Sequence, residues 1–380
     1  MDADEVSRLR PSRLEISRSA LRNNYDELSK LVAPAKLMPV LKANAYGHGM
    51  IECAKIFTEM GATCFCVAYV EEAIALRNGG VQGNILVMGG LSGEQIDLFI
   101  EHDLDITASS VGKLQRIEVA SKRLGKKARV QLKIDTGMHR IGVNYKRADS
   151  MIEEAASCKN CNFVGAFSHF AKAEDPDLSY SKLQLQRFKD TLEVLEARLG
   201  DKLDENFVRH ISNSGSTLQF KEAHLDFVRP GLALYGASPN PHQEAPVALS
   251  PAMTIRSEVC FFKVVNAGSG VSYGHTWTAT KDTQIVTIPI GYGDGFPRRL
   301  GNKASALIRG KRYPIVGRVC MDQCMIDIGD DKAFNNDEVV LLGKQGDEEI
   351  SLTEIAELLE TDPREFLCQL NIRLPRLYVD

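Results

Sequence analysis

A lysine directly follows a short apolar run near the start of the chain. Residues 37–41 (LMPVL) lead into Lys42, and the segment KANAYGHG continues over residues 42–49. At the end of a buried strand, apolar surroundings disfavour the charged ammonium and leave a neutral amine. Such an amine can form a Schiff base with a carbonyl compound, so Lys42 is a candidate nucleophile. The ordinary alternative is a lysine whose stem covers apolar surface while its ammonium reaches water.

Two later loops have the composition of a phosphate site. The chain reads HISNSG over residues 210–215 and RPGL over residues 229–232. Backbone N–H groups and small hydroxyls hold phosphate at the corresponding loops of many barrels. A Schiff-base lysine together with a phosphate site suggests pyridoxal 5′-phosphate (PLP). Taken alone, Ser214 and Gly231 are equally typical of ordinary turns.

The nine cysteines are an odd number without the spacing of a disulfide scaffold. They indicate free thiols in a reducing compartment. Cys158 and Cys161 form an isolated C-x-x-C, and no second pair completes a zinc site. We therefore expect ordinary thiols there and no metal.

The elements that must position these residues alternate between strand and helix. Apolar runs typical of strands occur at residues 37–41, 64–70, 84–88, 104–107, 128–134, 163–168, 207–212 and 225–228. Between them lie helical patterns, such as Phe188, Leu192, Leu195 and Leu199 at the spacing of one helix face. Eight such units predict an α/β fold, a (β/α)8 TIM-type barrel over residues 1–245, with functional residues at the carboxyl ends of its strands. No G-x-G-x-x-G follows the first strand, which disfavours a dinucleotide-binding sheet.

The pattern changes after a predicted linker at residues 240–246. Short β-rich runs follow at residues 258–265, 283–290, 304–308, 315–319, 324–328 and 338–342, and helical patterns at 351–360 and 363–370. They predict a mostly β C-terminal domain over residues 246–380. The early run at residues 13–16 could pair with this domain.

Charge and hydropathy restrict the partners. The formal net charge is −4, without a dense basic block, which argues against nucleic acid and favours a small-molecule substrate. No stretch approaches the ~20 apolar residues of a membrane helix, and the N-terminus is charged where a signal peptide would be apolar. We expect a cytoplasmic protein with no membrane partner.

Several ordered segments resemble the alanine racemase family. KANAYGHG at residues 42–49 is similar to the PLP-attachment signature of that family. The other similar segments are KIDTGMHR (133–140), SHF (168–170), RPGL (229–232), VSYG (271–274), GYGDG (291–295) and GRVCMD (317–322). They span both predicted domains. The resemblance implies a PLP-dependent isomerase that interconverts L- and D-alanine and supplies D-alanine for peptidoglycan.

The same resemblance assigns roles to residues. Racemisation removes the Cα proton on one face and returns it on the other, so two bases are needed, here Lys42 and Tyr273. A phenol is protonated at neutral pH and needs positive charge or hydrogen bonds nearby to act. In this family the tyrosine comes from the partner subunit, which implies a head-to-tail homodimer with shared active sites.

The remaining implied residues surround the cofactor and the substrate. The cofactor set comprises Lys42, Tyr46, His169, Asn213, Ser214, Arg229, Gly231 and Leu232. Arg229 would face the pyridine nitrogen and keep it unprotonated, because arginine does not give up its proton. His169 would orient Arg229, and His210 would support them from farther out. Arg140 and the Met321 backbone would bind the substrate carboxylate, and Lys133 matches a position that is often carbamylated. The other supporting residues are Tyr292, Arg298, Arg318 and Asp322.

The chain departs from the family pattern near its end. The family usually has a tyrosine before Arg-Val-Pro-Arg, whereas this chain reads NIRLPR over residues 371–376. Ile372 cannot donate that hydroxyl to the phosphate, and pocket selectivity rests on only about 1–3 kcal/mol. Serine or a wider range of small amino acids is therefore an alternative substrate. A non-catalytic PLP-binding protein would not need Tyr273, and a PLP-dependent decarboxylase would carry an acid where this chain has Arg229.

Overall fold

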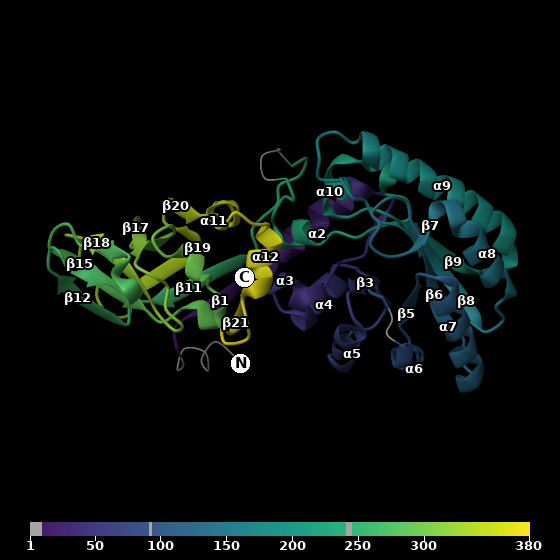
Figure 1. Ribbon diagram of the computed structural model, residues 1–380, viewed down its shortest axis with the longest axis horizontal. Helices are drawn as coiled ribbons and strands as arrows, with labels where there is room; N and C mark the ends of the chain where they lie inside the picture. Colours follow the sequence, from purple (N-terminus) through teal and green to yellow (C-terminus); the bar gives the residue numbers. More distant parts are fainter. Residues whose placement is uncertain (1–9, 91–92, 241–244) are drawn as a thin grey trace. The chain divides into compact units, whose positions relative to one another are not determined.

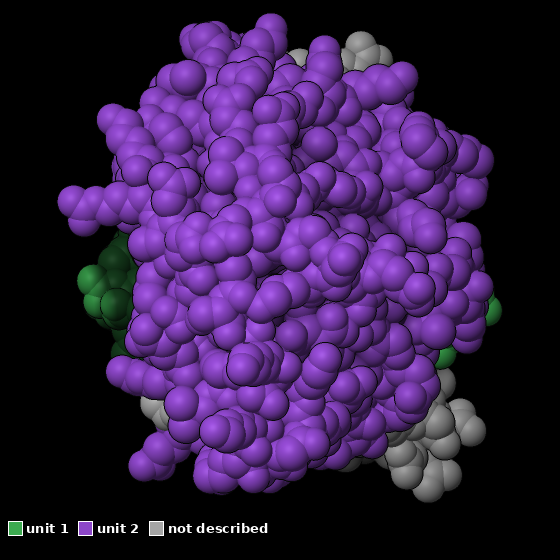
Figure 2. Space-filling model, turned by 90° about the vertical axis from the view of Figure 1, so that its right-hand side faces the viewer, with its two compact units in different colours: residues 1–20, 46–49, 251–380 green, residues 21–45, 50–250 purple. Residues whose placement is uncertain are grey.

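A computed structural model describes residues 10–90, 93–240 and 245–380 (Figure 1). The chain divides into two compact units. Unit 1 comprises residues 1–20, 46–49 and 251–380, and unit 2 comprises residues 21–45 and 50–250. Figure 2 shows one face that is formed mainly by unit 2.

Unit 2 contains eight parallel strands that form a nearly closed barrel. Their order is β2-β10-β9-β8-β6-β5-β4-β3, and a parallel bridge between Val40 and Cys66 joins the first strand region to the last. The strands are β2 (Lys36–Leu37), β3 (Cys64–Val67), β4 (Asn84–Val87), β5 (Asp105–Ala108), β6 (Ala128–Asp135), β8 (Cys161–Phe167), β9 (Leu203–His210) and β10 (Phe227–Val228). Strand β7 (Val143–Asn144) pairs with β6 off this path. The predicted barrel is confirmed.

Helices follow the strands, and most of them bury an apolar face. They are α2 (Arg18–Val32), α4 (Met50–Glu59), α5 (Val70–Asn78), α6 (Ile96–Glu101), α7 (Val111–Leu124), α8 (Ala148–Ser157), α9 (Ser179–Leu199) and α10 (Ser214–Gln219). On α9, Phe188, Leu192, Leu195 and Leu199 are buried, as their spacing predicts. Each such side chain contributes about 1.5–3 kcal/mol. Helix α7 begins at a Ser110 cap, which accepts from Lys113 N, and ends at Gly125 with φ 64°.

Several barrel strands differ in their bounds from the predicted runs, β9 and β3 among them. Strand β9 begins at Leu203, four residues before the expected start at residue 207, although Asp204, Glu205 and Asn206 are polar. Pairing of Leu203 with Phe163 of β8 extends the ladder through them. Strand β3 ends at Val67 because Val70 already begins α5. In β9 backbone pairing outweighs side-chain polarity, and in β3 the following helix ends the strand before its apolar run is complete.

Unit 1 is built on a mixed sheet of ten strands. Its order is β12-β15-β18-β17-β16-β19-β11-β1-β21, with β20 beside β19. The strands are β1 (Arg13–Ser17), β11 (Met253–Glu258), β12 (Phe261–Val265), β15 (Thr283–Ile288), β16 (Ser305–Ile308), β17 (Lys311–Val316), β18 (Cys324–Gly329), β19 (Glu338–Gln345), β20 (Glu348–Ile350) and β21 (Arg376–Val379). Strand β1 pairs with β11 and β21, so the early run does belong to the β-rich part.

Several strands after residue 246 were not predicted: β11, β20 and β21, and the short pair β13 (Gly270–Val271) and β14 (Trp277–Thr278). Strand β11 ends at Glu258 and β12 begins at Phe261, whereas a single strand was expected over residues 258–265. Burial alternates along β11, with Met253, Ile255 and Ser257 inside. The buried serine hid this alternation in the sequence. Helices α11 (Leu352–Leu359) and α12 (Pro363–Gln369) begin after Ser351 and Asp362 caps, close to the predicted ranges.

Within the described residues, no helix is both long and apolar enough to cross a membrane. Most of the predicted linker, residues 241–244, lies outside the described residues.

Candidate active site

Lys42 begins a left-handed turn that follows the first barrel strand. Ala43, Asn44 and Ala45 have φ values of 52°, 55° and 55°. Left-handed backbone costs roughly 1–2 kcal/mol per residue without glycine, so a run of three persists only where its surroundings hold it. Strain of this kind is concentrated at functional sites.

Glu72 of α5 holds this turn in place. Its carboxylate accepts from Ala43 N at 2.7 Å and from Ala68 N at 2.8 Å. On the other side, the Asn44 side chain accepts from Met50 N at 2.9 Å. Sequence analysis missed Glu72, because an acidic residue in the first turn of a helix is ordinary. The turn fixes the direction in which the chain leaves Lys42.

Arg229 follows β10 and is only 2% exposed. Its Nη2 donates to the Ser168 carbonyl at 2.8 Å and to the Ile211 carbonyl at 3.0 Å. The Nη1 group donates to His210 Nδ1, and Nη2 lies 3.2 Å from His169 Nδ1. Burial lowers the pKa of this guanidinium to about 10, so it stays charged at neutral pH. Its Nε is buried and has no hydrogen-bond partner among the described residues.

His210 contacts Arg229 directly, closer than the supporting position expected for it. Its Nε2 lies 2.7 Å from Gln131 Oε1, which can only accept. This places the imidazole proton on Nε2 and leaves Nδ1 as the acceptor for Arg229. Burial, with Arg229 and Lys133 next in effect, lowers the pKa of His210 well below its ordinary value. The neutral ring is therefore the form present at neutral pH.

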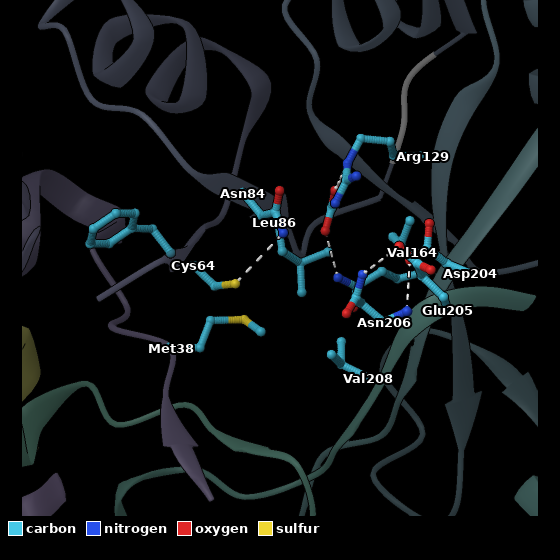
Figure 3. Close-up of a pocket in the computed structure, with 13 residues that line it drawn as sticks. Met38, Cys64, Asn84, Leu86, Arg129, Val164, Asp204, Glu205, Asn206 and Val208 are labelled. Atoms are coloured by element: carbon cyan, nitrogen blue, oxygen red, sulfur yellow. Dashed lines mark hydrogen bonds and ion pairs between the residues drawn. The ribbon is translucent and has the colours of Figure 1, made fainter. Parts of the chain in front are cut away.

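The hydrogen-bond chain continues through the barrel to its opposite end. Gln131 Nε2 donates to Asp105 Oδ2 at 2.8 Å, and Arg129 Nε donates to Asp105 Oδ1 at 2.7 Å. Asp105 and Arg129 line a cavity of about 200 Å³ at the amino-terminal ends of the strands (Figure 3). Because Lys42 follows the carboxyl end of a strand, this cavity is not the predicted site. Gln131 and Asp105 were both missed as supporting residues.

Phe167, at the end of β8, is the platform for the basic groups. The Lys133 Nζ lies 4.4 Å from its ring centroid, the Arg229 guanidinium carbon lies 5.4 Å away, and His210 stacks at 5.1 Å. Lys133 is 4% exposed, and burial followed by Arg229 and Arg140 lowers its pKa well below the ordinary value. The aromatic face of Phe167 attracts a cation at this position.

His169 lies near the remaining predicted basic residues of unit 2. Burial lowers its pKa well below the ordinary value, and Arg229, Lys133, Arg140 and Lys42 follow as smaller causes. All four basic side chains are therefore close enough to His169 to lower its pKa. The structure thus gathers the predicted residues of the barrel at the carboxyl ends of its strands.

The predicted phosphate loops lie side by side after β9 and β10. Ser214 Oγ accepts from Gly231 N at 2.9 Å and from Ala233 N at 3.4 Å, so the hydroxyl can still donate its proton. Leu232 follows directly in the chain. The Asn213 side chain caps α10 by accepting from Ser216 N at 3.2 Å. Asn213 thus shapes this loop through the cap.

Tyr273 belongs to unit 1 and is 69% exposed. It lies in a wide groove of about 880 Å³, lined also by Phe261, Val264 and His275. A Cβ at Gly274 would lie 3.2 Å from Arg318 Nη1, so this guanidinium packs on the tyrosine turn.

The other predicted residues of unit 1 are distributed over its surface. Asp322 accepts from Arg373 Nη2 at 2.6 Å, and the Met321 carbonyl accepts from Gly293 N at 2.8 Å. The exposed residues are Tyr292, Arg298, Arg318, Met321, Asp322 and Ile372. Tyr46 is buried and is part of unit 1.

Comparisons with known proteins agree with this architecture. Residues 16–239 match the family model of the alanine racemase N-terminal domain, and residues 252–378 match that of the C-terminal domain. The chain is 42% identical over 373 residues to the alanine racemase of Carboxydothermus hydrogenoformans, covering 98% of this chain and 100% of the relative.

Solved structures give the same result. The alanine racemase of D-cycloserine-producing Streptomyces lavendulae has a TM-score of 0.93 at 37% identity and covers 98% of both chains. The enzyme of Bacillus anthracis with bound L-Ala-P has a TM-score of 0.91 at 33% identity, covering 98% of this chain and 96% of that one. A barrel with a lysine at its mouth and a separate β-rich unit define a two-domain amino-acid racemase. The chain belongs to the alanine racemase family.

Proposed function

We propose that the protein interconverts L- and D-alanine with bound PLP, using Lys42 and Tyr273 as its two bases. The observation that carries the proposal is the buried cluster around Arg229, whose Nε lacks a partner among the described residues. An arginine needs an acceptor there, and the unprotonated ring nitrogen of PLP is one. A PLP decarboxylase would need an acid at this position, and Arg229 does not fit that role.

The residues present fit the cofactor. The Ser214 hydroxyl, beside the Gly231 and Leu232 backbone, would donate to the phosphate, and Lys42 would hold the aldehyde carbon. When bound, PLP delocalises the electrons that are left when the substrate loses its Cα proton. Arg229 would leave the ring nitrogen unprotonated, which limits that delocalisation and favours rapid return of the proton over side reactions.

The chain's own groups then move the proton. The Lys42 amine would remove or return it on one face of the substrate, and the Tyr273 phenol would do so on the other. Arg140 would hold the substrate carboxylate by paired hydrogen bonds, together with the Met321 backbone. His169 and His210 keep Arg229 oriented. Lys133, if carbamylated, would become an anion able to pair with Arg140.

Two bases on opposite faces require a second subunit in this proposal. Phe261 and Val264, beside Tyr273, are 56% and 65% exposed, and a surface of this kind is typical of an interface. We infer a head-to-tail homodimer in which the partner subunit's Tyr273 completes each site. The domain division at residue 245, the cytoplasmic location and the supply of peptidoglycan precursors stay predictions.

Alanine is the substrate that the family match favours over serine or a wider range. Ile372 is 90% exposed in the chain by itself. The effect of losing the family tyrosine at this position stays a prediction.

The test is to incubate the protein separately with L-alanine and L-serine and to follow formation of each D-isomer. Rapid turnover of alanine supports the assignment, and preferred turnover of serine contradicts it. Lys42→Ala is expected to abolish racemisation. Tyr273→Phe should slow proton removal from one enantiomer at least about a hundredfold and from the other less, as the loss of one general base predicts. Equal losses for both enantiomers, measured as hydrogen exchange with solvent, would contradict the two-base assignment.

A further inference from the structure

Two cysteines and a glutamate meet at the amino-terminal end of the barrel. Glu118 lies on α7, Cys158 directly follows α8, and Cys161 is the first residue of β8. Their two Sγ atoms and one carboxylate oxygen lie within 4.8 Å of one another. Across residues 10–90, 93–240 and 245–380, this is the one such group that could hold a metal ion. None of these residues belongs to the proposed racemase site.

The backbone fixes both cysteines. Cys158 N bonds to the Glu154 and Ala155 carbonyls, each at 3.2 Å, and Cys161 pairs with Ala128 of β6. The two cysteines are 4% and 7% exposed. Their C-x-x-C spacing is that of zinc ligands. The missing second pair argued against a metal in the sequence, but a third ligand comes from a different helix.

Glu118 is held against the turn between the cysteines. Its Oε1 accepts from Lys159 N at 3.0 Å and from Asn160 Nδ2 at 2.7 Å, and its Oε2 accepts from Asn160 N at 2.9 Å. These bonds hold the carboxylate with an oxygen within 4.8 Å of both sulfur atoms.

The charges around this group suit a divalent ion. The Lys202 ammonium donates to the Cys158 carbonyl at 3.2 Å. It adds one positive charge beside the three candidate ligands. Metal binding to thiols releases their protons. Exchange of the two thiol protons for one divalent cation therefore leaves the net charge of this cluster unchanged.

We propose that Glu118, Cys158 and Cys161 bind one thiophilic divalent cation of the zinc type, with a fourth position open to water. Tetrahedral ligands with bonds of ~2.3 Å lie ~3.8 Å apart, so the present separations need only small side-chain rotations. Thiolates select soft cations over magnesium or calcium. A bound ion would join α7, α8 and β8, and so its role would be structural.

The test uses the full chain, reduced and freed of metal with a chelator, with Cd²⁺ and Zn²⁺ as probes. We expect thiolate-to-cadmium charge-transfer absorption that saturates at one ion per chain. Cys158→Ser with Cys161→Ser should abolish it, whereas the exposed Cys260→Ser should leave it unchanged. Glu118→Gln retains an acceptor for the turn N–H groups but loses the charge, and should weaken binding at least about tenfold.

X-ray absorption spectroscopy of the unaltered, Zn²⁺-loaded chain tests the proposal even if the cysteine variants do not fold. A shell of two sulfur and two lighter ligands supports the proposal. A shell of oxygen and nitrogen alone overturns it, as does absorption that is lost in Cys260→Ser. An intact mass showing a Cys158–Cys161 disulfide that persists under reductant overturns it as well.

Discussion

Arg229 is a buried cation whose contacts in the chain are carbonyls and imidazoles. Each neutral acceptor satisfies one N–H group without neutralising the charge. The arrangement depends on the tautomer of His210, which in turn depends on Gln131. At the residue scale, the position of Arg229 therefore depends on Gln131, which acts through His210.

Replacing Gln131 tests this dependence. Gln131→Leu would leave the buried Nε2–H of His210 without its acceptor, which costs about 1–3 kcal/mol of stability. We also expect kcat to fall at least about tenfold with a changed pH profile, because the other tautomer turns an N–H towards Arg229. Urea unfolding and the pH dependence of kcat and KM measure both effects. Gln115→Leu on the exposed face of α7 is the control, and an unchanged pH profile for Gln131→Leu would refute the positioning role.

Lys133 predicts a pH dependence of stability. Its folded pKa is lowered well below the ordinary value, mainly by burial, so the unfolded chain binds one more proton between the folded and the unfolded pKa. The free energy of unfolding therefore increases as the pH rises from the folded pKa of Lys133 to its unfolded pKa of about 10.4. In buffer free of carbon dioxide, Lys133→Met should stabilise the fold at neutral pH, and its advantage should shrink as the pH rises.

Denaturant unfolding at several pH values checks the Lys133 prediction. Lys122→Met on the exposed face of α7 is the matched control and should show no such trend. A constant difference between Lys133→Met and the unaltered chain at all pH values would mean that Lys133 is charged in the folded protein.

At the scale of elements, the left-handed turn after Lys42 depends on helix α5. A carboxylate serves Ala43 N and Ala68 N with separate oxygens, whereas an amide offers one carbonyl oxygen. Glu72→Gln should therefore cost about 1–2 kcal/mol and loosen PLP at Lys42. Equilibrium dialysis of PLP and thermal unfolding measure this, with Glu71→Gln on the exposed face of α5 as the control. Unchanged PLP affinity would show that the left-handed turn is stable without the Glu72 carboxylate.

At the scale of the whole molecule, the shared-site homodimer predicts complementation. Lys42→Ala and Tyr273→Phe homodimers should each be inactive, but their mixed dimer would contain one site with both bases intact. After dissociation and random reassociation, about a quarter of the normal activity should return, since half of the dimers are mixed and one of their two sites is intact. Persistent inactivity, with mixed dimers shown by native mass spectrometry, would place both bases on one chain.

The sequence by itself determined the barrel, because continuous apolar runs and apolar residues at a 3.6-residue period reflect local geometry that each segment carries alone. It also indicated Lys42 and the loops at residues 210–215 and 229–232 as a candidate site, since each directly follows a predicted strand. Tertiary structure decided what depends on side chains meeting across strands: the Glu72 anchor, the Gln131–Asp105 chain and the Glu118 partner of the C-x-x-C pair. Their residue types are common on any surface, and only the register of β5, β6 and the neighbouring helices brings them within hydrogen-bond distance.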